Sequence, residues 1–233
     1  MARDPRIWGG TLAHLAQSAR ATLPPIHPAG RGFIALGLSV ALLGHHHRVL
    51  RRLGFGFAAA TAFSFRHPAR VPPSDRRAIV SPADGTVCLV DQATPPADLG
   101  LSDFPRPRVA IFLSILDVHI QRAPITGTVT KIAHTPGRFL PADDPAAGQA
   151  NERNALRLRD NDGVVVDVVQ IAGLLARRIV CQAKVSQRLE RGAPYGLIRF
   201  GSRVDTYLPV GTTPLVRTGQ RMVAGETVLG TLP

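Results

Sequence analysis

The chain has 233 residues, of which 45% are hydrophobic and 19% charged, so it can build a folded core and does not have the composition of a disordered protein. Its net charge is +12, and residues 1–80 hold eleven arginines against two aspartates. Basic charge of this kind serves binding to nucleic acid or to anionic lipid. Because the basic residues flank apolar runs and lack the interleaved aromatics of a nucleic-acid groove, we expect a lipid partner and no nucleic acid.

The N-terminal third of the chain contains two apolar runs. Residues 1–32 are irregular and lack the pattern of a secretory signal. The runs Phe33–Gly44 and Leu53–Phe65 follow, separated by the basic link 45–52. Each run is shorter than the roughly 20 residues that cross a bilayer. We therefore expect two short helices that form a membrane-associating hairpin, inserted in one leaflet or lying on its surface. The alternative is that both helices pack on a soluble core.

From residue 66 the pattern changes to short apolar or alternating runs separated by Gly, Pro and Asp, which is typical of β-strands. The expected strands are 78–80, 86–91, 109–116, 127–134, 154–159, 164–171, 179–184, 196–200, 204–208, 213–216 and 227–232. Only 142–152 and 173–178 have helical character. The sequence thus predicts an N-terminal helical segment over residues 1–65. Residues 66–233 are predicted as a mainly β domain, and the hairpin-like tail 217–230 suggests a barrel-sandwich type of fold.

Gly201 and Ser202 form the only Gly-Ser dipeptide of the chain and lie between two strand-like runs. The glycine permits backbone angles that a Cβ would block, and the serine hydroxyl is placed to attack the carbonyl carbon of Gly201. Such an attack is the first step of self-cleavage to a pyruvoyl group. The alternative is a polar turn in a hairpin.

Two further residues are candidates for chemistry. Asp84 stands at a turn entering a strand, where a carboxylate can act or can satisfy turn amides. His119 follows the most apolar run, and a histidine there is either a structural side chain or a proton donor. Cys88 and Cys181 show no Cys-x-x-Cys spacing, so we expect neither a disulfide scaffold nor a metal site.

Six blocks of the chain, in the right order, resemble the phosphatidylserine decarboxylase family in its short, pyruvoyl-dependent branch. The blocks are Ile26–Gly30, Phe65–Arg70, Ser81–Val87, Asp117–Pro124, the group Asn151–Asn154 with Gln170–Gly173 and Ala176–Val180, and Phe200–Asp205. His67 stands where the family usually has Asp. The resemblance extends over almost the whole chain.

The resemblance implies self-cleavage between Gly201 and Ser202 into a β chain, 1–201, and an α chain, 202–233. Ser202 would become a pyruvoyl cofactor that forms a Schiff base with the amine of phosphatidylserine and yields phosphatidylethanolamine. Asp84 would assist Ser202, and His119 would return a proton to the substrate carbon. A pyridoxal phosphate enzyme is disfavoured because the chain has only Lys131 and Lys184.

One position departs from the better-known long branch, whose second histidine is replaced here by Arg122. An arginine stays protonated and cannot act as a base. Either His119 serves both steps, or Asp84 acts with water alone. Arg122, Arg177 and Arg178 are candidates to bind the lipid phosphate, with surface salt bridges as the alternative.

The expected partners are a phospholipid membrane, phosphatidylserine and the two chains of one precursor, with a homodimer as a further expectation. The expected location is peripheral, at the cytoplasmic face of the cell membrane. Alternative functions are a pyruvoyl decarboxylase of another seryl-lipid or of a soluble amino acid, and a non-catalytic module like the biotinyl and lipoyl carriers. The carrier hypothesis is weakened because the tail lacks a lysine, and a decayed homologue is disfavoured by the presence of the three candidate residues with Gly201.

Overall fold

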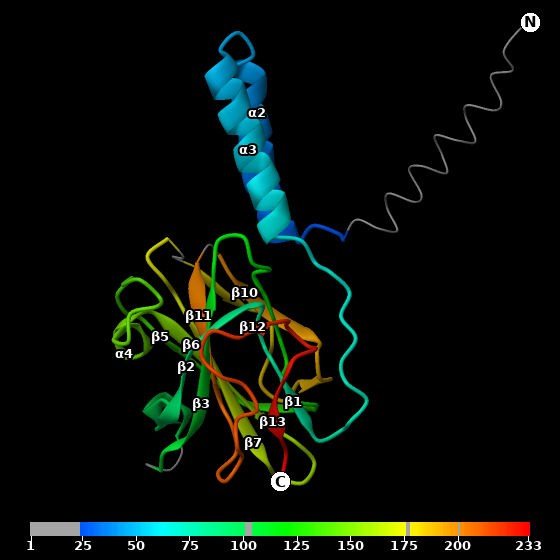
Figure 1. Cartoon of the computed structure of the whole chain (residues 1–233), viewed down its shortest axis with the longest axis vertical. Coiled ribbons are helices and arrows are strands. Elements are labelled where there is room, and N and C mark those ends of the chain that lie inside the picture. The colour runs from blue at the N-terminus through cyan, green and yellow to red at the C-terminus, as the bar shows by residue number, and fades with distance from the viewer. Residues whose placement is uncertain (1–23, 101–103, 176–177, 200) are drawn as a thin grey trace, which may run out of the picture. The chain divides into compact units, whose positions relative to one another are not determined.

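A computed structural model describes residues 24–100, 104–175, 178–199 and 201–233. The chain divides into two compact units, Met1–Ala69 and Arg70–Pro233. Arg177 and Phe200, which the sequence analysis named, lie outside the described residues. Figure 1 shows a pair of helices in the first unit and a body of strands in the second.

The described part of the first unit is a hairpin of two antiparallel helices, α2 (Pro28–Leu43) and α3 (Arg48–Ser64) (Figure 1). The helix α2 begins with Pro28 at its first position, where proline is favoured, and the side chain of His27 accepts the N–H of Ala29 at 3.2 Å. The prediction of two helices is confirmed. The basic link is shorter than expected, because α3 begins at Arg48 and places three of its arginines in the helix.

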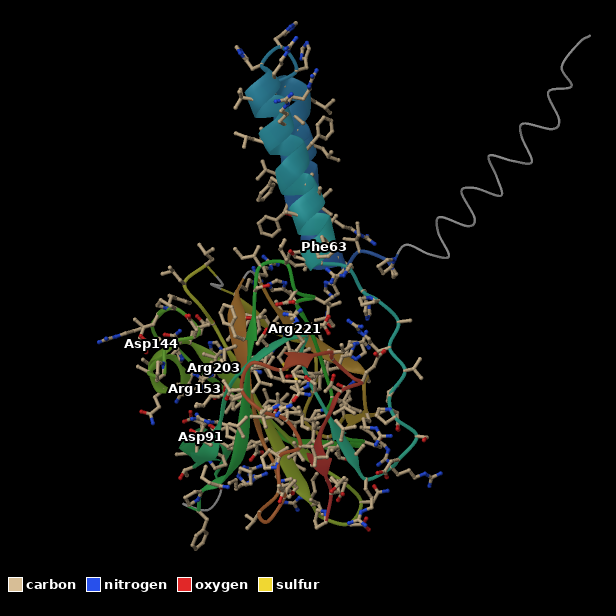
Figure 2. All side chains as sticks on the ribbon, viewed as in Figure 1. Phe63, Asp91, Asp144, Arg153, Arg203 and Arg221 are labelled. Carbon is tan, nitrogen blue, oxygen red and sulfur yellow. The ribbon has the colours of Figure 1, made fainter. Side chains whose placement is uncertain are left out.

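The two helices pack through small residues. A Cβ on Gly54 would lie 2.6 Å from the carbonyl oxygen of Gly37, so the backbones approach too closely for a side chain there. Ala41 and Ala58 are buried at the same seam. The large apolar side chains point outward instead, as Figure 2 shows for Phe63, which is 50% exposed. The seam between the two helices is thus lined by small residues, whereas the outer surface of the hairpin carries large apolar side chains.

The second unit is mainly β, as predicted. Its elements are β1 (Ala78–Val80), β2 (Gly85–Ala93), η1 (Ala97–Leu99), β3 (Arg106–Leu113), β4 (Ile120–Arg122), β5 (Gly127–Thr135), α4 (Ala147–Ala150), β6 (Arg153–Arg159), β7 (Val165–Ile171), β8 (Ile179–Cys181), β9 (Arg188–Leu189), β10 (Pro194–Ile198), β11 (Ser202–Tyr207), β12 (Arg221–Met222) and β13 (Val228–Thr231). Within the described residues the largest sheet has eight strands, in the order β12-β2-β3-β11-β7-β6-β5-β9, and it curls into a half-barrel. The order β4-β10-β8 makes a second sheet, and β1 pairs with β13.

The two faces of the large sheet differ in character. On β3, Val109 and Ile111 point into the main hydrophobic core. The alternate residues Arg106 and Arg108 point to the other face, because successive side chains of a strand alternate. There Arg106 pairs with the buried carboxylate of Asp167 at 2.7 Å. The opposite face therefore carries buried ion pairs, among them the one made by Arg203 (Figure 2).

Several boundaries differ from the sequence prediction. The strand expected over 109–116 ends at Leu113, because residues 114–117 form a turn. Residues 213–216 are not a strand, and the two- or three-residue strands β4, β9 and β12 were not predicted. Helix forms only at Ala147–Ala150 within 142–152, and the described residues of 173–178 are not helical. The errors fall on short segments whose structure depends on distant partners.

Candidate active site

Ser202 is the first residue of β11, a strand in the middle of the large sheet. Its backbone pairs with Leu113 of β3. The side chain is fully buried, and its Oγ has no hydrogen-bond partner among the described residues. Leaving a buried hydroxyl unsatisfied costs about 1–3 kcal/mol. A cost of this kind calls for an explanation, and a chemical task for the hydroxyl provides one.

Gly201, directly before β11, has a φ of +65°. A residue with a Cβ is strained in this left-handed region by about 1–2 kcal/mol, whereas glycine is not. A Cβ built on Gly201 would meet no heavy atom within 4 Å, so the glycine serves the backbone angle and not a shortage of space. The unusual angle anticipated from the sequence is present.

His119 contacts this glycine. Its Nε2 accepts the backbone N–H of Gly201 at 3.2 Å, and its Nδ1 lies 2.7 Å from the carbonyl oxygen of Asp117. A carbonyl oxygen can only accept, so in the neutral ring Nδ1 carries the proton and Nε2 presents its lone pair. The side chain is fully buried. The lone pair of His119 therefore faces the segment that contains Gly201 and Ser202.

The turn that orients His119 is fixed by the carboxylate of Asp117. Its Oδ2 accepts both the N–H and the hydroxyl of Ser114 at 2.8 Å, and its Oδ1 pairs with Arg221 at 2.6 Å. Burial raises the pKa of Asp117, but the hydrogen bonds from Arg221 and Ser114 outweigh it, so the pKa lies below its ordinary value. The ionised carboxylate thus holds the turn between β3 and His119.

Asp84 lies in a charged cluster with Arg70. Its Oδ2 pairs with Arg70 at 2.7 Å, and its Oδ1 accepts the N–H of Ala224 at 2.7 Å. The pKa of Arg122 is lowered by burial and by the charge of Arg70, and Asp84 opposes this shift. Asp84 precedes β2, and β3 separates β2 from β11, so its backbone lies two strand spacings, about 10 Å, from that of Ser202.

An apolar cavity of about 520 Å³ opens beside Gly201. Its walls come from the end of β3, the turn after it and two loops, and the lining residues include Phe112, Leu116, Ala142 and Leu175. Leu116 and Leu175 are 58% and 62% exposed, so the mouth of the cavity carries apolar side chains in contact with solvent. The arrangement suits a molecule with an apolar part next to a reactive end.

Of the arginines named from the sequence, Arg122 and Arg178 are described, and they lie at opposite ends of β10. Arg122 is buried, and its Nη1 donates to the carbonyl oxygen of Gly192 at 2.7 Å. Arg178 is exposed, and its carbonyl accepts the N–H of Arg199 at 3.2 Å. Burial and the nearby charge of Arg178 both lower the pKa of Arg199. Arg178 and Arg199 are therefore neighbours through their backbones, and Arg199 lies two residues before Gly201.

Sequence reasoning did not single out Arg70, Ser114, Arg221 or Asp117 as parts of the site. Arg70 had a signal, since it ends the block Phe65–Arg70. Ser114 lies three residues before Asp117, a spacing typical of a turn in which a side chain bonds to the backbone. Arg221 reaches Asp117 from 104 residues away, and no local pattern indicates that contact.

No metal cluster accompanies these residues: the described ranges contain no group of three or more His, Cys, Asp or Glu side chains that could hold an ion. Cys88 and Cys181 are free thiols.

The family model for phosphatidylserine decarboxylase matches residues 57–230. The chain is also 57% identical over 240 residues to a phosphatidylserine decarboxylase proenzyme of Mycobacterium marinum, with all of both chains covered. The chain belongs to the phosphatidylserine decarboxylase family. The family consists of carboxy-lyases, and the resemblance stated from the sequence is confirmed. Proenzymes of the same name from Mycobacterium avium and Mycobacterium tuberculosis are 55% and 58% identical, over 100% and 98% of this chain and of each relative.

Proposed function

We propose that the chain is a self-processing decarboxylase that cuts itself between Gly201 and Ser202 and converts phosphatidylserine to phosphatidylethanolamine. The observation that carries this proposal is the contact of His119 Nε2 with Gly201 beside the buried, unpartnered hydroxyl of Ser202. The substrate is inferred from the name shared by the family and the relatives.

The cut uses groups of this chain alone. The Oγ of Ser202 attacks the carbonyl carbon of Gly201, its proton passes to a base, and the peptide bond becomes an ester with a free amine on residue 202. Loss of the α-proton of residue 202 then expels the Gly201 carboxylate and leaves dehydroalanine. Water converts this group to a pyruvoyl and releases ammonia. The β chain ends at Gly201, and the α chain begins with the pyruvoyl.

We assign the base to His119. Its Nε2 lone pair already lies against Gly201, whereas Asp84 starts two strand spacings away. The Gly201 N–H must release Nε2 before the Ser202 hydroxyl can donate to it. In the second reaction His119 returns a proton to the substrate carbon after CO2 leaves. One histidine thus serves both steps, which removes the need for a second histidine where Arg122 stands. Asp84 neutralises Arg70 and Arg122 and supports the turn into β2.

The residues present fit a pyruvoyl group. The Ser202 side chain is buried but unpaired, and the space beside Gly201 is open. When formed, the group supplies an electrophilic ketone that draws electrons from the substrate as CO2 departs.

The apolar cavity beside Gly201 favours a lipid over a soluble amino acid. Among the residues that the structure describes, its lining offers no charged side chain other than Asp143, so the carboxylate and amine of free serine would be poorly recognised by these walls. The acyl and glycerol parts of a phospholipid suit such walls. Arg178 and Arg199 are our candidates for the phosphate, because an anion relieves the repulsion between two neighbouring cations.

We further propose that the helical hairpin associates with the membrane surface. Its outer side chains are large and apolar, and its α2–α3 link is flanked by exposed Arg48, Arg51 and Arg52, which suits anionic lipid. Neither α2, α3 nor any other described helix combines the length and hydropathy needed to cross a bilayer. The cytoplasmic face and a homodimer stay predictions from the sequence.

Intact-mass measurement of the purified full chain tests the proposal. We expect two fragments, of which the smaller starts at the former Ser202 and has a blocked N-terminus. The processed protein should release CO2 from phosphatidylserine vesicles but not from free serine. The Ser202→Ala variant should stay whole and release no CO2. A wild-type chain that remains uncut under native conditions, or a variant that still decarboxylates, would overturn it.

A further inference from the structure

Three buried side-chain amides form a hydrogen-bonded ladder that ends on His119. Asn154 Nδ2 donates to Gln170 Oε1, Gln170 Nε2 donates to Gln121 Oε1, and Gln121 Nε2 donates to the carbonyl oxygen of His119. Each of the three bonds is 3.0 Å long. Gln170 and Gln121 are 0% exposed and Asn154 is 4% exposed.

The direction of the ladder follows from its last member. The carbonyl of His119 can only accept, so Gln121 must turn its NH2 group toward it and its oxygen toward Gln170. Gln170 must then donate to Gln121 and accept from Asn154. The whole ladder is oriented by one backbone carbonyl, and aligned bonds of this kind strengthen one another.

The ladder joins the large sheet to the three-stranded sheet. Asn154 is on β6 and Gln170 on β7 of the large sheet, whereas Gln121 is on β4 of the three-stranded sheet. The carbonyl of His119 also accepts the N–H of Ile198, at the end of β10, at 3.3 Å. The histidine therefore has its carbonyl fixed by the ladder, its Nδ1 by Asp117 and its Nε2 by Gly201.

Amides suit this task better than ionisable groups. A buried carboxylate or ammonium would shift the pKa of the His119 ring and would itself need a partner. Amides both donate and accept and remain neutral at every ordinary pH. The ladder thus fixes position without changing the charge of the site.

We propose that Gln121 and Gln170 are positioning residues that hold His119 for both the self-cleavage and the decarboxylation. This inference rests on the proposed function, because it assigns the ladder to the histidine that acts there. Neither glutamine touches the reacting atoms, so each acts through His119. A displaced base loses rate steeply, on the order of a hundredfold for 1 Å.

The test compares Gln121→Met and Gln170→Met with two controls, Thr206→Val and Tyr195→Phe. Methionine keeps the length of glutamine and removes both hydrogen bonds. Each control removes a buried hydroxyl that has no partner among the described residues and lies outside the ladder. Self-cleavage is timed by intact mass, and turnover of phosphatidylserine vesicles is normalised to the amount of processed chain. Melting curves establish that every variant is folded at the assay temperature.

We expect both ladder variants to cleave and to turn over about tenfold more slowly, with KM unchanged and with the controls within twofold of wild type. In a ¹⁵N-histidine-labelled Ser202→Ala chain, His119 should give the signal of a ring protonated at Nδ1, and Gln121→Met should shift or broaden it. Ladder variants that match the controls in rate and leave the His119 signal unchanged would overturn the inference. An uncut wild-type chain would instead overturn the proposed function, so the two failures are distinguishable.

Discussion

The backbone nitrogen of Gly201 lies 3.2 Å from Nε2 of His119, and the hydrogen bond between them ties the residue before the proposed cut to the proposed base. The N–H occupies the lone pair that the Ser202 hydroxyl needs. In the proposed mechanism the uncut chain is therefore held in a resting arrangement, and this bond must open before the attack.

Replacing His119 separates these two effects. His119→Ala should slow self-cleavage by about 10²–10⁴-fold, the usual contribution of a general base. His119→Gln keeps a side-chain acceptor for the Gly201 N–H but cannot take up a proton, so it should preserve the melting temperature better and cleave no faster. Intact mass over time gives both rates. Rapid cleavage of either variant would assign the base elsewhere.

Gly201→Ala should cost about 1 kcal/mol of unfolding free energy, because the residue has a positive φ but open space around it. Gly211→Ala is a matched control, with a φ of +82° and no heavy atom within 4 Å of its Cβ. Denaturant titrations of the uncut Ser202→Ala chain should give similar losses for both. Only Gly201→Ala should slow the cut in the otherwise native chain, and equal cleavage rates would contradict the importance of that backbone angle.

The Asp117–Arg221 pair predicts a pH dependence of stability. The pKa of Asp117 is lower in the folded chain than its ordinary value of about 3.9. The pair therefore stabilises the fold fully above that value, and the contribution is lost as the pH falls through the lower, folded pKa. Asp117→Asn should be less stable than wild type by roughly 1 kcal/mol at neutral pH, since Arg221 is largely exposed.

The difference between wild type and Asp117→Asn should shrink as the pH falls below about 4. Urea titrations of the uncut Ser202→Ala chain, with and without Asp117→Asn, measure these unfolding free energies between neutral and acidic pH, with Asp162→Asn, an exposed aspartate, as the control. A difference that stays constant over this range would show that the ion pair is not its source.

The helical hairpin offers a pair of glycines for a matched test. Gly54→Val should separate α2 from α3, because any Cβ there meets the backbone of Ala41 and Gly37. Gly56 lies two residues further along α3, about half a helical turn, and a Cβ there would meet no heavy atom within 4 Å, so Gly56→Val is the matched control. Sedimentation with anionic vesicles should fall for Gly54→Val alone, and self-cleavage should be equal in both. Equal sedimentation would mean that the helix pair is not needed for membrane binding.

Patterns close together in the chain predicted most of the fold. The alternation on β3, with Val109 and Ile111 facing the core, and the apolar runs of the hairpin are local signals, and the structure confirms the elements they indicate. The strands β4 and β12 have two or three residues each and exist because Gln121 and Arg221 find distant partners. Such pairings leave no period in the sequence.

The site divides in the same way. The residues Ser202, His119 and Asp84 stood in recognisable blocks, whereas the sequence could not indicate which of His119 and Asp84 lies nearer to Gly201. That distinction depends on the placing of β3 between β2 and β11. The amide ladder from Asn154 to His119 is equally invisible, since its members come from three strands in two sheets.

The position of β11 in the sheet bears on the order of folding and the proposed cut. The segment 202–233 supplies β11 between β3 and β7, β12 against β2, and β13 against β1. A cut before Ser202 would therefore leave both products bound to each other through the strand pairs that they share. If the chain cuts itself as proposed, folding comes first and cutting second, and the mature enzyme would be a two-chain complex that assembled as a single molecule. Once unfolded, its chains would have to find each other by diffusion, and the original one-chain folding route would no longer be open to them.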